Sequence, residues 1–377
     1  MGSIMLRRLL VMTMLGMVLV TLSTCFGVVW AQSLEPTSLF EPGQYGVGLR
    51  SFKFVDESRG NRTLQTFVWF PADKNDPNAN RLSESSLVLA NSTPDKSGGP
   101  YPLLIYSHGS PGSSSEMRDM VEHLVSRGFV VAAAQHIDTV PIRLELVDRP
   151  LDVLLVLNQL AGMNDGELAG VIDTNNVGVM GFSMGAINTS ELIGMERDPV
   201  HYTTWCAEHP EVETLDCDPP PSEIIWDFDA IAAYRTTLGL EDLSDGTWAP
   251  FTDERIRAAM MMAPCIFPLT TEEMITDVKI PTLVLHGVTD ATCDYQGNAV
   301  RIFDHLGTDE RYLFSIINGD HNSFITHTEV QWYFAVAFFS YYLGGDDTYA
   351  PYLKLDDFSF FDRFGSFKVV SGAYKGG

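Results

Sequence analysis

The sequence predicts an α/β fold, with a mainly parallel central sheet covered by helices on both faces. Short apolar runs typical of strands alternate along the chain with segments whose aliphatic residues recur at helical spacing. Hydrophobic residues account for 45% of the 377 positions, which is ample for a sizeable core. We therefore expect a single α/β domain over residues 32–377.

The expected elements follow one another in a regular order. The first two strands flank a turn-rich stretch and should form a hairpin, and a polar surface loop is expected over residues 71–100. Strands are expected at 47–55, 63–70, 102–106, 129–134, 177–182, 256–263, 282–286 and 312–317. Helices are expected at 114–126, 148–160, 186–195, 295–305 and 329–342.

Residues 196–255 interrupt this alternation. They contain three consecutive prolines, many acidic residues and the tryptophans Trp205, Trp226 and Trp248. We interpret the stretch as an insertion that forms a lid or cap over the functional site. The alternative is a surface decoration that does not contact substrate.

The N-terminus has the pattern of a secretory signal peptide over residues 1–31. Arg7 and Arg8 precede an apolar run over 9–22, and small residues before Gln32 predict cleavage after Ala31. An uncleaved membrane anchor is the main alternative, and a lipid anchor at Cys25 fits less well because a threonine precedes it. No other segment is long and apolar enough to span a bilayer. The protein is therefore expected to be secreted or periplasmic.

The chain is strongly acidic, with a formal net charge of −25. Such a surface argues against nucleic acid or an anionic membrane as a partner. The oligomeric state cannot be read from the sequence.

Four cysteines remain outside the export segment, and an even number in an exported protein favours disulfides. Cys206 and Cys217 share a loop-like stretch, so a Cys206–Cys217 pair is plausible. Cys265 and Cys293 each follow an apolar strand-like run, and a Cys265–Cys293 pair would lie near the ends of neighbouring strands. Free thiols are the alternative for either pair.

The most informative motif is Gly-Phe-Ser-Met-Gly at residues 181–185. A strand-like run precedes it and a helix is expected after it, which is the setting of a nucleophile elbow. The flanking glycines leave room for a tight turn that lifts the oxygen of Ser183 clear of the sheet. We therefore take Ser183 as the candidate nucleophile.

A serine nucleophile needs a base and an acid on loops that follow other strands. His321 is the candidate base, because it lies in a turn-like loop directly after the last expected strand. Asp290 is the candidate acid, since it follows the penultimate strand and gives the order serine, acid, histidine along the chain. Asp294 is its rival. The other histidines considered are interpreted as loop supports (His108 and His286), helix residues (His123 and His305), a residue too early in the chain (His136) and residues of the insertion (His201 and His209).

The oxyanion hole should come from two backbone N–H groups. Met184 follows the nucleophile and supplies one of them. The loop over residues 107–113 should supply the other from Ser110, because Pro111 has no N–H to give.

With these motifs the chain resembles the α/β-hydrolase superfamily over roughly residues 45–345. It is most similar to secreted dienelactone-hydrolase-like esterases that include relatives of platelet-activating-factor acetylhydrolase, and it is also similar to cutinase-like polyester hydrolases. The resemblance implies an α/β-hydrolase fold with Ser183, Asp290 and His321 as the triad. Dienelactone hydrolases carry cysteine at the position of Ser183, and polyester hydrolases carry an aromatic residue at that of Ser110, so neither substrate is favoured. The segments that carry the resemblance are SHGSPG (107–112), SRGFVV (126–131), GFSMG (181–185), HGVTD (286–290) and GDH (319–321).

These observations predict a serine esterase that cleaves carboxylic esters, short-chain or acetyl esters above all, through an acyl-enzyme. The substrate would be a small-molecule or lipid ester, and no metal or organic cofactor is required. The competing interpretations are a non-catalytic binding module on the same fold, and an amidase, acyltransferase or polyester hydrolase that uses the same triad.

Overall fold

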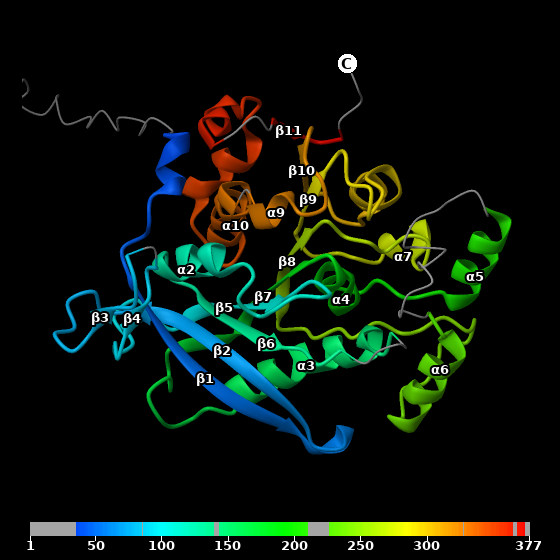
Figure 1. The fold of residues 1–377 in the computed structure, drawn as a ribbon, viewed down its shortest axis with the longest axis horizontal. Coiled ribbons are helices and arrows are strands. Elements are labelled where there is room, and N and C mark those ends of the chain that lie inside the picture. The colour runs from blue at the N-terminus through cyan, green and yellow to red at the C-terminus, as the bar shows by residue number, and fades with distance from the viewer. Residues whose placement is uncertain are drawn as a thin grey trace, which may run out of the picture. The chain divides into compact units, whose positions relative to one another are not determined.

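A sheet of nine strands runs through the part of the chain that the structure describes (Figure 1). The computed structural model describes residues 35–84, 86–138, 143–209, 226–326, 328–364 and 368–373. The predicted export segment, residues 1–31, lies outside these ranges. In their order across the sheet, the strands are β1 (Gly46–Asp56), β2 (Arg62–Ala72), β6 (Val130–Gln135), β5 (Tyr101–Ser107), β7 (Ile172–Phe182), β8 (Ile256–Met262), β9 (Thr282–Gly287), β10 (Arg311–Ile316) and β11 (Val369–Ser371).

The strand directions confirm the predicted fold class. From β6 to β10 every neighbouring pair is parallel. The β1–β2 hairpin joins one side of this block antiparallel, and β11 joins the other side antiparallel to β10. The carboxyl ends of the parallel strands therefore meet at one edge, where their loops are free to form a site.

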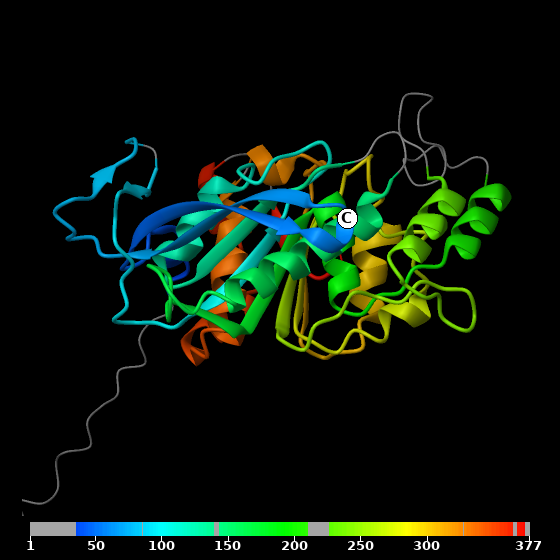
Figure 2. The same cartoon turned by 90° about the horizontal axis from the view of Figure 1, so that it is seen from below.

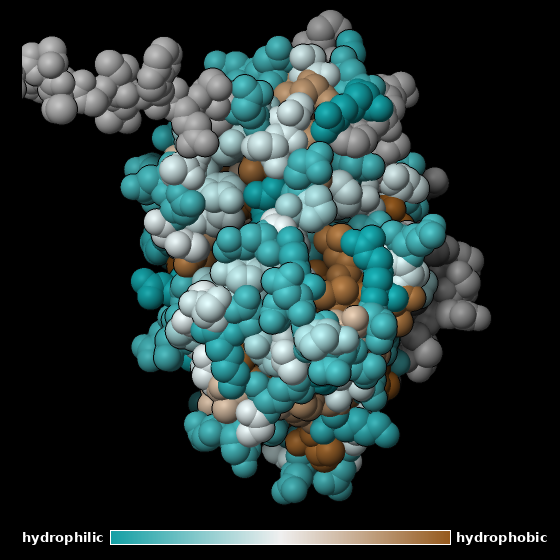
Figure 3. Space-filling view, turned by 90° about the vertical axis from the view of Figure 1, so that its left-hand side faces the viewer, coloured by the Kyte–Doolittle hydropathy of each residue, from teal (hydrophilic) through white to brown (hydrophobic). Residues whose placement is uncertain are grey.

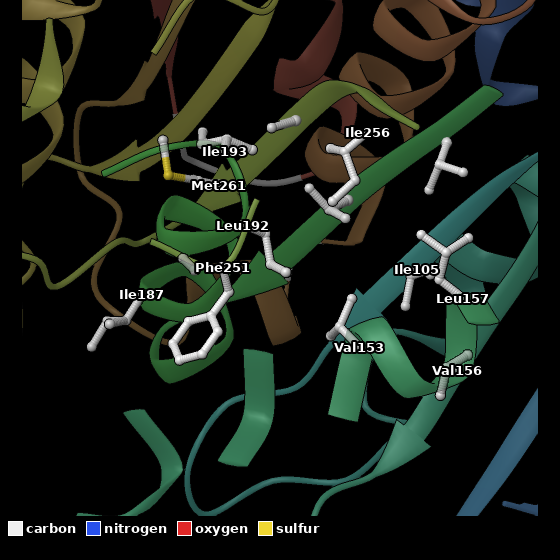
Figure 4. Close-up of a cluster of buried hydrophobic side chains, with 14 of the residues drawn as sticks. Ile105, Val153, Val156, Leu157, Ile187, Leu192, Ile193, Phe251, Ile256 and Met261 are labelled. Carbon is white, nitrogen blue, oxygen red and sulfur yellow. The ribbon is translucent and has the colours of Figure 1, made fainter. Parts of the chain in front are cut away.

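Each face of the sheet buries its own hydrophobic core, because successive side chains of a strand point to opposite faces. In β5, Leu103 and Ile105 join the core beneath α3 (Glu145–Ala161) and α4 (Met184–Leu192). Leu104 and Tyr106 join the core beneath α2 (Arg118–Ser126) and α10 (Thr328–Tyr342). Figure 2 shows the sheet between its helices in a second view. Figure 4 shows part of the first core, with Ile105, Val153, Val156, Leu157, Ile187, Leu192, Ile193, Phe251, Ile256 and Met261.

Several elements differ from the expected ones. The helix expected at 114–126 begins at Arg118, and the one expected at 295–305 begins as the π-helix η3 before it becomes α8. The polar stretch over 71–100 contains a two-stranded pair, and the C-terminal segment adds short helices before β11. The remaining bounds are η1 (Pro36–Phe40), η2 (Glu57–Arg59), β3 (Asn80–Arg81), β4 (Leu89–Ala90), α7 (Glu272–Ile275), η3 (Gln296–Val300), α8 (Arg301–His305), α9 (Ser323–Thr326), η4 (Asp347–Lys354) and η5 (Ser359–Phe364).

The predicted insertion, residues 196–255, contributes two helices, α5 (Pro199–Glu208) and α6 (Phe228–Thr237), which lie at one end of the molecule in Figures 1 and 2. Side chains on its inner side join the core beneath α3 and α4, including the buried Trp248 and Phe251. The guanidinium carbon of Arg235 lies over the Trp248 ring, 4.9 Å from the ring centroid. The described part of this stretch is therefore packed into the domain.

One face of the described surface is mainly polar. Figure 3 shows a face that is mainly hydrophilic, with small and separate hydrophobic patches. In the ranges that the structure describes, no helix has the length and apolar character needed to cross a membrane.

Candidate active site

Ser183 lies on the tight turn between β7 and α4. Its backbone has φ 53° and ψ −117°, a conformation that residues other than glycine rarely adopt. A Cβ on Gly185 would overlap the carbonyl oxygen of Ser107, and a Cβ on Gly181 would overlap the carbonyl group of Gly185. The two glycines therefore permit the close backbone approach that the turn requires.

The structure brings Ser183, His321 and Asp290 together. Ser183 Oγ lies 2.9 Å from His321 Nε2, and His321 Nδ1 lies 2.8 Å from Asp290 Oδ2. Asp290 follows β9, His321 lies between β10 and α9, and Ser183 follows β7, so the carboxyl ends of three parallel strands of one sheet supply the group, with β8 between β7 and β9. The geometry is that of a serine held by a base, with the base held by a carboxylate.

The carboxylate of Asp290 is buried and fully engaged. Its Oδ1 accepts backbone hydrogen bonds from Thr292 at 2.8 Å and Cys293 at 2.9 Å, while Oδ2 faces His321. Burial by itself would raise the pKa of Asp290, but its interactions with His321 outweigh that effect and lower the pKa below the ordinary value. The rival Asp294 is exposed, and its Oδ2 accepts from the Gly297 N–H at 2.5 Å.

The two predicted oxyanion donors lie beside this group. Ser110 and Met184 line the same cavity as Ser183 and His321. Met184 is the first residue of α4, where a backbone N–H has no acceptor inside the helix. The Met184 N–H is therefore available to donate to a carbonyl oxygen placed near Ser183.

The cavity beside Ser183 has a volume of about 340 Å³. Its apolar wall is formed by Phe182, Ile187, Trp226 and Ile325. Trp226 belongs to the stretch that the sequence identifies as an insertion, so that stretch reaches the cavity. Such a lining suits an apolar group attached to a reacting carbonyl.

The predicted Cys265–Cys293 disulfide is present and adjoins the triad. Cys265 lines the cavity, and the Cys293 N–H is one of the two that hold Asp290. The predicted Cys206–Cys217 pair cannot be described, because Cys217 lies outside the described residues. Among the described residues, candidate ligand atoms of Asp290, Cys293 and His321 lie within 4.8 Å of one another. They offer no free ligand set, because the sulfur is in the disulfide and the other two side chains bond to each other.

The two histidines interpreted as loop supports are buried: His108 directly follows β5, whereas His286 lies within β9, one residue before its end. His108 Nδ1 donates to the Gly109 carbonyl at 2.7 Å, and His286 Nδ1 donates to the Gly287 carbonyl at 2.9 Å. Burial lowers the pKa of His108 to about 3, so this imidazole is neutral near pH 7.

A second hydrogen-bonded serine–histidine–aspartate group is buried in the domain. Ser107 Oγ is 3.1 Å from His136 Nε2, and His136 Nδ1 is 3.0 Å from Asp152 Oδ2. All three residues are buried, and none lines the cavity. Sequence reasoning set His136 aside by chain order and found neither of its partners.

Sequence reasoning also missed Glu116 and Arg149, which contact the loop over residues 107–113. Arg149 is a charged residue at the start of an aliphatic helix, and this is the one feature of the sequence that points to it.

Residues 79–148 match the family model described as platelet-activating factor acetylhydrolase, isoform II. With the parallel sheet and its flanking helices, this match decides the fold. The chain has the α/β-hydrolase fold. The matched part of this hydrolase includes β5 and the loop with Ser110, and it supports a hydrolase of the esterase or lipase type. No curated protein sequence matches the chain significantly.

Proposed function

We propose that this α/β-hydrolase is a serine esterase that cleaves carboxylic esters through an acyl-enzyme. The observation that carries the proposal is the hydrogen-bonded line from Ser183 through His321 to Asp290, placed at the wall of a cavity. The family match over residues 79–148 agrees with ester hydrolysis.

The proposed mechanism uses each group once in each half of the reaction. Nε2 of His321 takes the proton of Ser183 while Oγ attacks the ester carbon, and it then gives that proton to the leaving alcohol. The N–H groups of Ser110 and Met184 stabilise the oxyanion, and a donor of this kind is worth about 3 kcal/mol of barrier. In the second half, Nε2 takes a proton from water while the water attacks the acyl-enzyme, and Nε2 then returns that proton to Ser183 Oγ as the acid leaves. Asp290 accepts from Nδ1 and thereby holds the tautomer in which Nε2 is free.

We propose short acyl esters as the substrates. A cavity of about 340 Å³ lies at the small end of the range for ligand pockets. In this proposal the stretch over residues 196–255 acts as a cap, since its Trp226 forms part of the cavity wall. The substrate would be a small ester or a lipid ester with a short acyl chain.

Replacement of Ser183 tests the nucleophile. Ser183→Ala should abolish hydrolysis of p-nitrophenyl acetate while circular dichroism and thermal unfolding stay unchanged. Ser58→Ala is the matched control, because Ser58 is an exposed serine on the turn of the β1–β2 hairpin. Substantial residual turnover in Ser183→Ala would exclude Ser183 as the nucleophile.

An acyl-chain series tests the substrate class. Rates with p-nitrophenyl esters from acetate to palmitate should fall as the chain outgrows the cavity, and a phospholipid and a polyester film extend the series. Rates that rise with chain length and at interfaces would instead identify a lipase.

We also propose that the enzyme is exported and that cleavage follows Ala31. The Cys265–Cys293 disulfide suits an oxidising compartment. Mass spectrometry of the protein recovered from the medium or periplasm should find Gln32 at the N-terminus; an N-terminus upstream of Arg7 would contradict the proposal.

A further inference from the structure

The loop over residues 107–113 is held by a buried cation that takes no part in the triad. Arg149 of α3 has a side chain with 0% of its surface exposed. Its Nη1 donates to the carbonyl oxygen of His108 at 2.5 Å, and its Nη2 donates to that of Gly109 at 3.2 Å. One planar guanidinium thus fixes two consecutive carbonyl groups of the loop.

Asp138 balances the charge of Arg149. It accepts from Arg149 Nε at 2.8 Å and from Nη2 at 2.5 Å, and its Oδ2 also accepts from Ser110 Oγ at 3.2 Å. Burial alone would raise the pKa of Asp138, but the hydrogen bonds and charge of Arg149 outweigh burial and lower it. Asp138 therefore stays ionised and links the guanidinium to the side chain of Ser110.

Glu116 also holds this loop. Its Oε1 accepts from the Gly109 N–H at 2.7 Å and from the Tyr106 hydroxyl at 2.6 Å. The Gly109 N–H is thus already bonded, and Pro111 has none to offer. Within the described part of the chain, the Ser110 N–H has no acceptor, and Ser110 lies in the cavity wall with Ser183.

We propose that Arg149 is a positioning residue of the oxyanion hole. It orients the loop over residues 107–113 so that the Ser110 N–H faces the ester carbonyl at Ser183. The inference rests on the proposed esterase function. An oxyanion donor accelerates the reaction only when its orientation is set beforehand, because reorientation during the reaction would cancel the gain. The two loop carbonyls and the Asp138 carboxylate together set that orientation through one guanidinium.

Arg149→Lys separates charge from geometry. The lysine keeps the positive charge opposite Asp138, but its single ammonium cannot reproduce the planar fork that spans both carbonyls. Arg301→Lys is the matched control: Arg301 is a largely buried arginine that donates to the Thr270 carbonyl at 2.8 Å and lies 3.7 Å from Glu272. It makes no contact with the loop.

The experiment measures kcat and KM for p-nitrophenyl acetate and Ki for a trifluoromethyl ketone, whose adduct with the serine carries an oxyanion. Arg149→Lys should lower kcat about 10- to 100-fold with KM changed less than about 2-fold. The Ki of the ketone should rise by the same factor as kcat/KM falls, whereas Arg301→Lys should leave all three values near those of the wild type.

A second variant covers the case in which Arg149→Lys does not fold. Asp138→Asn leaves the arginine in place and weakens the hold on it, so it should give a smaller loss with the same match between Ki and kcat/KM. An unchanged Ki for the ketone in the folded variants, or a loss confined to KM, would overturn the inference.

The rates of the wild type and of Ser183→Ala distinguish failure of the inference on Arg149 from failure of the proposed esterase function. If the wild type turns over esters and Ser183→Ala does not, the function stands, and the Arg149 and Asp138 variants judge the inference alone. If the wild type hydrolyses no ester, the function fails, and the inference falls with it.

Discussion

Replacing Asp290 with asparagine should disable catalysis through a mismatch of hydrogen bonds that the structure makes explicit. Two backbone N–H groups, those of Thr292 and Cys293, point at Oδ1. The asparagine must keep its oxygen there, so its NH₂ group replaces Oδ2 and faces His321 Nδ1. Two donors cannot share that contact, and the imidazole must shift its proton to Nε2. It can then no longer accept the proton of Ser183.

The expected loss follows from this change of tautomer. A comparable replacement in a serine–histidine–aspartate triad lowers kcat about 10⁴-fold, equivalent to about 5 kcal/mol of barrier. Asp294→Asn is the matched control, four residues away, and should change kcat/KM less than about 3-fold because it alters only an exposed turn. Initial rates with p-nitrophenyl acetate from pH 6 to 9 would measure both. A larger loss for Asp294→Asn, or a loss below about 10-fold for Asp290→Asn, would refute the reasoning.

Two further predictions concern stability. Burial lowers the pKa of His123 to about 4 from an unfolded value near 6.5, so on acidification the unfolded chain takes up a proton that the folded state refuses. The free energy of unfolding should therefore fall between pH 6.5 and 4, by on the order of 3 kcal/mol from this group. Urea unfolding at several pH values should show that it falls less steeply with pH in His123→Gln than in the wild type, and an equal pH dependence would contradict the assignment. Removing the Cys265–Cys293 disulfide, whose cysteines are 28 residues apart, should lower the free energy of unfolding by about 3–4 kcal/mol. Activity should fall as well, because the crosslink fixes the loop whose Cys293 backbone N–H donates to Asp290. Unfolding of the double Cys→Ser variant without reductant checks this, and an unchanged midpoint would exclude a stabilising role.

The parallel core of the sheet was predictable because its strands are short apolar runs bounded by turn signals. The strands at 102–106, 129–134 and 282–286 were placed within one or two residues, since burial on both faces makes such runs continuous. The C-terminal segment could not be placed in the same way. Its helices η4 and η5 are short, and β11 pairs with only three residues of β10, so tertiary contacts specify them.

The grouping of the candidate site followed from topology, because the elbow motif and the chain order place three residues after the carboxyl ends of strands in one parallel sheet. The supports of the site could not be found in this way. Arg149 and Asp138 lie about 30 to 40 residues beyond the loop in sequence, and no short motif relates them to it. Glu116 lies only seven residues after Gly109, but nothing in the local sequence shows that its carboxylate turns back to the Gly109 N–H. In the sequence all three are ordinary charged positions, and only the fold shows that Arg149 is buried and that Asp138 and Glu116 are half-buried beside the loop.

The buried chain Ser107–His136–Asp152 repeats the order of side chains seen at Ser183, with donor–acceptor distances within about 0.2 Å of it. A search by triad template alone would return this group as well as the one at Ser183. Of the two serines, Ser183 lines the cavity together with Ser110 and Met184, and Ser107 does not. In the proposed mechanism, reactivity therefore depends on the space around the serine. Ser107 of β5, His136 directly after β6 and Asp152 of α3 lie outside the cavity, and their hydrogen bonds crosslink these elements.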